Sequence, residues 1–288
     1  MDIDSIAVSV TGRGSQPAEE RDTRLEFISL PKEMNSYRAP EIPEPDKVHH
    51  LEGARETTNW IGQALERYRV GGEPQLADIS ALDAENRELV NQILGEGEVS
   101  LRFSGSPCVN MQESVLAGIW RTFYLDAKGA ITRDLIEVCD VPVLARRSPD
   151  ADRIADLAAV RTCEDVMNAL PILSEIQEQL RSWQSDCPAH VINLTLLPLS
   201  EGDIRFLGET LGRGPVETLS RGYGDCQITS TAYPGLWWVR YTNSMGTLIL
   251  NTLEITDIPL VACAAQEDLD DSRRRFLELL EPYWQTLA

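Results

Sequence analysis

The stretch Leu94-Gly95-Glu96-Gly97-Glu98-Val99 recurs 117 residues later as Leu211-Gly212-Arg213-Gly214-Pro215-Val216. The match continues without a gap over residues 94–145 and 211–262, and thirteen of these 52 positions are identical. Two copies are too few for a solenoid, which needs about three or more repeats. The repeat therefore predicts one pseudo-symmetric body or two similar lobes. Features that both copies share are expected to serve folding, and features of one copy are candidates for function.

Hydrophobic spacing predicts the elements within and around this repeat. Asp83 and Ser200 are expected N-caps of two helices, and Gly95 and Gly212 are expected to end them. After Gly97 apolar residues alternate with polar ones, which is typical of strands. The predicted fold class is α+β, with two pseudo-repeated units in which helices precede an antiparallel β-meander.

Three parts are expected along the chain. Residues 1–48 form an extended or disordered tail, residues 49–148 the first α+β repeat, and residues 149–288 a helical linker, the second repeat and a C-terminal helix. Pro40, Pro43 and Pro45 exclude a helix at the end of the tail. Residues 25–31 of the tail are expected to form a short strand. Residues 190–198 form an apolar run that predicts a buried strand.

The chain carries 46 acidic and 26 basic residues, for a net charge of −20. This excess argues against a nucleic-acid partner, because each phosphate contact needs a lysine or an arginine. It is compatible with a basic partner, and equally with solubility alone. No run approaches the ~18 apolar residues of a membrane span, so no stable membrane insertion is expected. The N-terminus lacks the features of a secretory signal, which predicts a cytoplasmic location.

Signals for catalysis and metal binding are weak. The six cysteines form no CxxC pair and none aligns with another at the 117-residue spacing, which excludes a duplicated cysteine-ligated metal. We therefore predict no catalytic residue, no metal, no cofactor and no enzymatic activity. Cys226 remains an alternative as a nucleophile, although no partner base is evident beyond His190 or a carboxylate. Asp140 and Asp257, shared by both copies, are expected to accept backbone N–H bonds where strands end.

The second copy has the composition of a recognition surface, because it gathers aromatic residues, arginines and a methionine on neighbouring strands. A half-buried aromatic core would explain many of these residues equally well. The candidate partner-binding residues are Arg213, Arg221, Tyr223, Cys226, Trp238, Asn243 and Met245.

The second copy also resembles a known family. The motifs are Leu211-Gly-Arg-Gly-Pro-Val216, Ser220-Arg-Gly-Tyr-Gly224, Asn243-Ser-Met245 and Glu254-Ile-Thr-Asp-Ile-Pro259. Together they are similar to the C-terminal region of the hydrogenase expression/formation family HupH, also called HyaF or HoxQ, and the resemblance covers about residues 28–272. Asp225 departs from the family pattern, in which asparagine commonly precedes the cysteine, and this puts an amide-dependent role there in doubt.

The resemblance implies an accessory protein, or chaperone, in the maturation of uptake nickel–iron hydrogenase. The implied partner is the immature iron–sulfur small subunit or its twin-arginine signal peptide, held before export, with other hydrogenase accessory proteins as further partners. Two alternatives stay open. One is a carrier or catalyst that uses Cys226 to transfer sulfur or iron, and the other is a scaffold for other accessory proteins.

Overall fold

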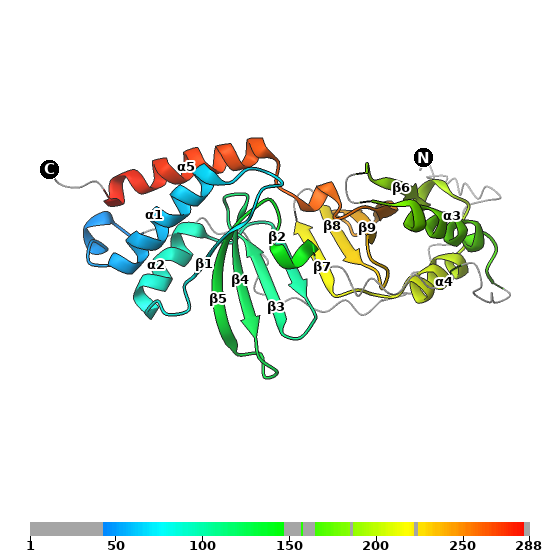
Figure 1. The fold of residues 1–288 in the computed structure, drawn as a ribbon, viewed down its shortest axis with the longest axis horizontal. Helices are drawn as coiled ribbons and strands as arrows, with labels where there is room; N and C mark the ends of the chain where they lie inside the picture. Colours follow the sequence, from blue (N-terminus) through cyan, green and yellow to red (C-terminus); the bar gives the residue numbers. More distant parts are fainter. Residues whose placement is uncertain (1–42, 147–156, 158–164, 185–186, 222–223, 285–288) are drawn as a thin grey trace, which may run out of the picture. The chain divides into compact units, whose positions relative to one another are not determined.

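The computed structural model describes residues 43–146, 157, 165–184, 187–221 and 224–284. The chain separates into two units, Met1–Ser36 and Tyr37–Ala288, and all described residues belong to the second unit. Within these ranges ten strands form one antiparallel sheet in the order β1-β5-β4-β3-β2-β7-β8-β9-β10-β6 (Figure 1). The strand expected at residues 25–31 lies outside the described residues, and the boundaries expected near residues 48 and 148 stay predictions.

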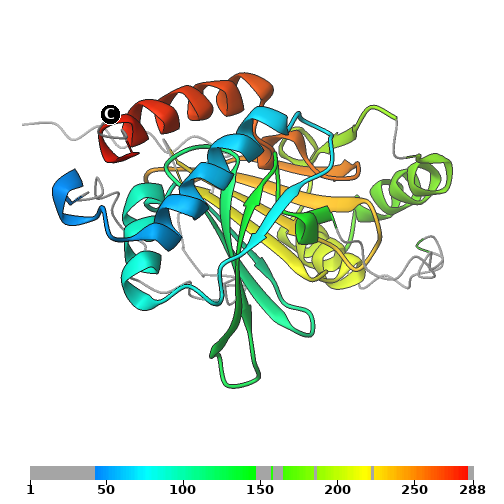
Figure 2. The same ribbon diagram turned by 60° about the vertical axis from the view of Figure 1, so that its left-hand side comes forward.

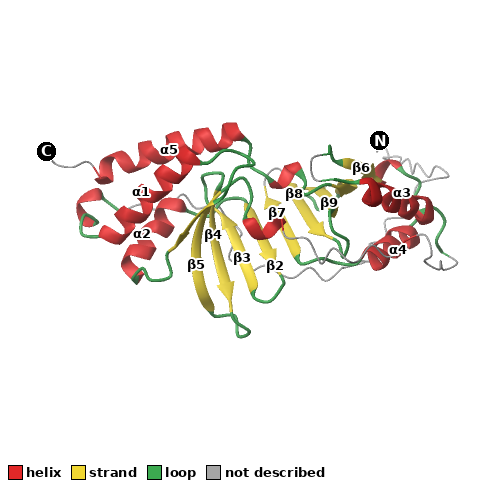
Figure 3. Cartoon of the chain, viewed as in Figure 1, coloured by secondary structure: helices red, strands yellow, loops and turns green. Residues whose placement is uncertain are grey.

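Helices and strands alternate in blocks along the chain (Figure 3). The helices are α1 (Glu52–Arg67), α2 (Ala84–Leu94), α3 (Ala169–Ser182), α4 (Glu201–Leu211) and α5 (Gln266–Trp284). The strands are β1 (Gln75–Asp78), β2 (Val99–Phe103), β3 (Cys108–Glu113), β4 (Ile119–Leu125), β5 (Ile131–Val138), β6 (His190–Asn193), β7 (Val216–Arg221), β8 (Gly224–Ser230), β9 (Leu236–Asn243) and β10 (Leu248–Ile255). The predicted α+β class is confirmed.

Elements recur in the structure at the spacing seen in the sequence. α2 and α4 begin and end at positions 117 residues apart. β2 pairs with β7 in antiparallel register, and the middle pair of this ladder is Leu101↔Thr218, again 117 residues apart. On either side the strands follow in mirrored order, β3-β4-β5 and β8-β9-β10. The two expected units thus share one sheet, and a duplication as their origin stays a prediction.

The ends of α2 and α4 follow local sequence signals. The Asp83 side chain accepts a hydrogen bond from the Asn86 backbone N–H at 2.9 Å. Ser200 forms a reciprocal capping box with Asp203 at the start of α4. Gly95 and Gly212 follow the two helices with φ of 58° and 63°, a region that favours glycine.

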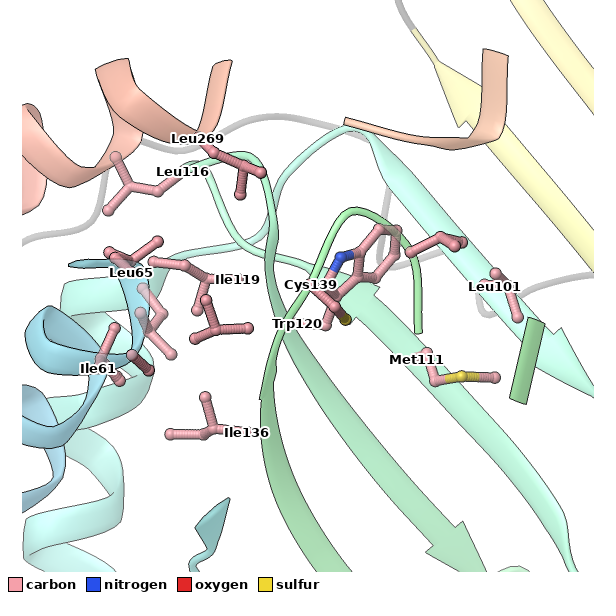
Figure 4. Close-up of a cluster of buried hydrophobic side chains, with 14 of the residues drawn as sticks. Ile61, Leu65, Leu101, Met111, Leu116, Ile119, Trp120, Ile136, Cys139 and Leu269 are labelled. Carbon is pink, nitrogen blue, oxygen red and sulfur yellow. The ribbon is translucent and has the colours of Figure 1, made fainter. Parts of the chain in front are cut away.

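Two hydrophobic clusters hold the helices to the sheet. In the larger one, Ile61 and Leu65 of α1 lie beside Ile119 and Ile136 of β4 and β5 (Figure 4). α1 also contacts α2 and α5 (Figure 2). In the smaller cluster α3 and α4 pack against β6, β9 and β10. The cluster of α1, α2 and α5 thus reaches strands of both halves of the sheet, including β7, β8 and β9, while the cluster of α3 and α4 lies at the β9–β10–β6 end.

Two expectations about local structure are wrong. The apolar run at residues 190–198 is not a buried strand, since β6 ends at Asn193, lies at the edge of the sheet that the described residues form, beside β10, and leaves Val191 52% exposed. Beyond β6 the chain forms a 3-10 turn, where the Thr195 hydroxyl accepts the N–H of Asn251 on β10 at 2.8 Å.

Among the described residues, the Asp140 carboxylate is bound by side chains and not by the expected backbone N–H groups. Its carboxylate accepts hydrogen bonds from the Tyr68 hydroxyl at 2.7 Å and from Arg146 Nη2 at 2.6 Å. The Asp140 carboxylate is buried, and the Tyr68 hydroxyl and the Arg146 guanidinium satisfy its hydrogen-bonding needs, a role that turn N–H groups were expected to fill.

Candidate functional site

Strand register sorts the candidate residues onto the two faces of the sheet. Paired residues on neighbouring strands share a face, and residues two apart along a strand do so as well. The pairs Arg102↔Glu217, Glu217↔Thr229 and Thr229↔Trp238 form one row across β2, β7, β8 and β9. Arg240, two residues after Trp238, lies on the same face.

Arg213, Arg102 and Arg240 lie in the neighbourhood of the Glu217 carboxylate. Arg213 follows α4, and its Nη1 lies 3.6 Å from Glu217 Oε1. Arg102 is the register partner of Glu217, and the charge of Glu217 also acts on Arg240. The Arg240 guanidinium carbon lies 5.6 Å from the centroid of the Trp238 ring, a cation–π distance. We call these five residues the arginine patch.

The arginine patch contains three arginines and one acidic residue. Burial lowers the pKa of Arg240, the positive charge of Arg213 lowers it further, and the charge of Glu217 raises it. Among the described residues the buried Nε of Arg102 has no hydrogen-bond partner. In a chain with a net charge of −20, the patch is a local group of basic residues.

Trp238 occupies a position that carries a charge in the first half of the sheet. Its indole Nε1 donates to Asn251 Oδ1 at 2.5 Å, and its ring lies next to Gly208 of α4. The positions 117 residues earlier hold Arg121 and Asp134, a buried ion pair in which Arg121 Nη2 donates to both carboxylate oxygens at 2.8 Å. A neutral indole–amide pair thus replaces an ion pair, and the tryptophan ring supports Arg240.

Asn243 and Met245 belong to the hairpin between β9 and β10, three and five residues after Arg240. Asn243 Oδ1 accepts the backbone N–H groups of Met245 and Thr247, both at 2.9 Å, so this side chain holds the turn. Asp126 accepts two backbone N–H groups in the same way in the hairpin of the first half. Met245 is 86% exposed at the tip, which leaves it accessible to a partner.

Cys226 lies on the opposite face of the sheet from the arginine patch, because it alternates with Gln227, the register partner of Arg240. It is buried, with 6% of its surface exposed. Burial raises the pKa of its thiol, although a hydrogen bond with Tyr241 lowers that pKa in part. The thiol is therefore protonated at neutral pH and is a poor nucleophile.

The structure brings together only part of the predicted set. Arg213 and Trp238 belong to the arginine patch, and Arg221 at the end of β7 shares the face of Glu217. Tyr223 lies outside the described residues. Arg102 and Arg240 were missed. Arg240 follows Trp238 by two residues in the sequence, but nothing in the sequence pairs Arg102 with the second half, because that pairing depends on the β2–β7 ladder.

In the part of the chain that the structure describes, no three or more histidine, cysteine, aspartate or glutamate side chains come together as a group able to hold a metal ion. Nor do these residues include a helix with the length and apolar character needed to span a membrane.

Comparison with known proteins gives consistent matches. A family model described as HupH hydrogenase expression protein, C-terminal conserved region, matches residues 52–162 and 166–283. The chain is 46% identical over 277 residues to the hydrogenase expression/formation protein HoxQ of Cupriavidus necator, covering 96% of each chain. It is 42% identical over 272 residues to HupQ of Azotobacter chroococcum, covering 94% of this chain and 95% of the relative. A solved structure of the hydrogenase expression protein HupH from Thiobacillus denitrificans is 32% identical, covers 38% of this chain and 92% of its own, and has a TM-score of 0.37.

Proposed function

The chain belongs to the HupH family of hydrogenase expression/formation proteins, and from this membership we propose that it acts as a chaperone that holds the immature iron–sulfur small subunit of hydrogenase before export. The accessory role in hydrogenase expression follows from the relatives. The choice of the small subunit as the bound component is the proposed step. The observation that carries it is the arginine patch, a cationic surface in an otherwise acidic protein.

The arginine patch favours the body of the small subunit over its twin-arginine signal peptide. The positive charges of Arg102, Arg213 and Arg240 repel a peptide that carries two arginines of its own. The signal peptide would instead match the excess of acidic residues elsewhere on the chain. The exposed Met245 hairpin offers an adaptable apolar contact for either part of the partner.

The alternative of a sulfur or iron carrier depends on Cys226. A carrier thiol needs thiolate character and access, and the burial of Cys226 opposes both. The scaffold alternative makes no demand on Cys226, and it differs from the chaperone proposal in the identity of the bound protein.

A pull-down with tagged protein tests the proposal. The bait is offered the hydrogenase small subunit of the same organism, with and without its signal peptide, and separately the other hydrogenase accessory proteins. We expect both forms of the small subunit to bind, with binding that weakens as salt is raised. Binding to neither form would end the chaperone proposal, and binding to accessory proteins alone would favour the scaffold.

A further inference from the structure

Exposed apolar residues lie where β10 begins, in the β9–β10 hairpin and in the turn after β6. Met245 at the hairpin tip is 86% exposed, and Leu248 and Ile249 at the start of β10 are 47% and 58% exposed. Leu196 lies in the 3-10 turn Leu194–Leu196, which contacts β10, and is 80% exposed. We call Leu196, Met245, Leu248 and Ile249 the apolar patch.

The turn after β6 continues along β10 toward its first residues. β6 pairs with the far end of β10, Thr252–Ile255, and the Thr195 hydroxyl accepts the N–H of Asn251 at 2.8 Å. In the first half the Ser80 hydroxyl accepts the N–H of Asp134 in the same way, at 2.9 Å. Asp134 and Asn251 are 117 residues apart, so the two turns are equivalent. The first half therefore provides an internal comparison for the apolar patch.

The equivalent surface of the first half is largely polar. At the positions of Leu196, Met245, Ile249 and Leu250 the first half has Ala81, Lys128, Thr132 and Arg133. Arg133 forms an ion pair with Asp78 of β1 at 2.7 Å. Leu248 keeps an exposed apolar counterpart, Ile131. Since one half of the sheet folds with a largely polar surface at this place, folding alone does not account for the apolar patch.

The apolar patch lies in a part of the chain without charge. Residues 191–200 and 241–253 contain no lysine, arginine, aspartate or glutamate, although 25% of the whole chain is charged. The second of these stretches is bounded by Arg240 and Glu254, one charge of each sign. A charged group of a partner that covered the patch would lose water without meeting an opposite charge there. An uncharged apolar ligand matches this surface, and depletion of charge is typical of the centre of a protein interface.

We propose that the apolar patch binds an uncharged, apolar segment of another protein. A second copy of this chain is a poorer occupant, because two chains that each carry a net charge of −20 repel one another. The same charge opposes an anionic membrane surface. The flexible Met245 side chain at the hairpin tip can adapt to segments of different shape. The hydrogenase small subunit as the source of the segment rests on the proposed function, whereas the chemistry of the segment does not.

The experiment exchanges the patch for the residues of the first half. The triple variant Leu196→Ala, Met245→Lys, Ile249→Thr takes its residues from the equivalent positions, so we expect it to fold. The control Leu260→Ser changes a leucine that is 84% exposed outside the patch. The probes are a fluorescein-labelled peptide of alternating leucine and alanine, a matched peptide with serine in place of every leucine, and the hydrogenase small subunit. Fluorescence anisotropy measures the binding of both peptides.

The wild type and the control are expected to bind the leucine peptide equally and the serine peptide not at all. The triple variant is expected to raise the Kd for the leucine peptide about tenfold or more, a change that the loss of one buried leucine side chain is enough to produce. High salt should not weaken this binding, because salt screens charges and not apolar burial. Met245→Lys alone, at the hairpin tip, should raise the Kd in part, and circular dichroism confirms that each variant is folded.

The outcomes separate the two proposals. Weaker binding of the leucine peptide to the triple variant supports the inference even where the small subunit fails to bind, and that failure counts only against the proposed function. Equal binding of the leucine peptide to the wild type and the triple variant would overturn the inference, as would no binding to the wild type. A wild-type dimer that the triple variant converts to monomers in sedimentation velocity would overturn it in favour of a second copy. Binding of the wild type to neutral phosphatidylcholine vesicles in place of the peptide would overturn it in favour of a lipid surface.

Discussion

Replacing Asp134 by asparagine removes the charge that compensates Arg121 inside the sheet. Both side chains are buried, with residue exposures of 3% and 6%, and both Asp134 oxygens lie 2.8 Å from Arg121 Nη2. Arg121 also donates to Asn91 of α2, so the guanidinium is held in place and cannot turn to solvent. Breaking a buried ion pair at one partner costs about 3–5 kcal/mol. Because asparagine keeps one oxygen acceptor, we expect a loss of about 3 kcal/mol in the free energy of unfolding.

The chain offers a matched control at its surface. Arg133 Nε lies 2.7 Å from Asp78 Oδ2, a similar distance, but these side chains are 53% and 45% exposed. Hydrogen bonds from Ser80 and then from Arg133 lower the pKa of Asp78 to about 2. Water and salt screen an exposed pair, however, so we expect Asp78→Asn to cost about 0–1 kcal/mol.

Urea unfolding followed by circular dichroism measures both losses under the same conditions. If Asp134→Asn lowers the urea midpoint far more than Asp78→Asn does, burial accounts for the difference in stability between the two ion pairs. The double variant Arg121→Met, Asp134→Leu should recover most of the loss, since apolar residues of similar volume often replace a buried pair without cost. A loss in Asp134→Asn no larger than that in Asp78→Asn would refute the reasoning.

Three further predictions concern glycine, pH and cysteine. Gly118 and Gly129 both have φ near +80°, but a Cβ at Gly118 would lie 2.0 Å from Leu269 Cδ2, while nothing lies within 4 Å at Gly129. Thermal unfolding should therefore show a clearly larger loss of stability, by about 1–3 kcal/mol, for Gly118→Ala than for Gly129→Ala. Burial raises the pKa of Glu113 from 4.5 to about 7, so stability should fall as pH rises between these values, and Glu113→Gln should flatten that fall in urea titrations at pH 5 and pH 8. The Cys226 thiol should resist iodoacetamide at pH 7 until the protein unfolds, and hydrogenase maturation should survive Cys226→Ser; rapid labelling of the folded protein would contradict this.

Features encoded by neighbouring residues could be predicted from the sequence. The helix starts at Asp83 and Ser200 and the ends at Gly95 and Gly212 depend on side chains and φ values within one turn. The strands of both meanders were predicted from alternation for the same reason. In residues 190–198 the local pattern failed, because an apolar run does not distinguish a buried strand from an edge strand with one neighbour.

Features that depend on distant pairing could not be predicted. Arg102 lies 115 residues before Glu217, and only the β2–β7 register makes them neighbours. The placement of Cys226 on the face opposite Arg240 likewise follows from strand alternation once the register is known. Composition alone grouped Arg213, Trp238 and Cys226, and the structure separates the cysteine from the other two.

The β2–β7 ladder has a consequence for any shortened form of this chain. The two halves join where β2 pairs with β7, over five residue pairs centred on Leu101 and Thr218. A fragment that ended after the first half would expose β2 as an open edge, which invites pairing with another chain. β2 and β7 pair about Leu101 and Thr218, which are equivalent positions of the two halves. We therefore expect β2 of one fragment to pair with β2 of a second fragment, giving a homodimer. That homodimer would keep the sheet continuous but would lack the arginine patch, whose carboxylate and two of its arginines belong to the second half.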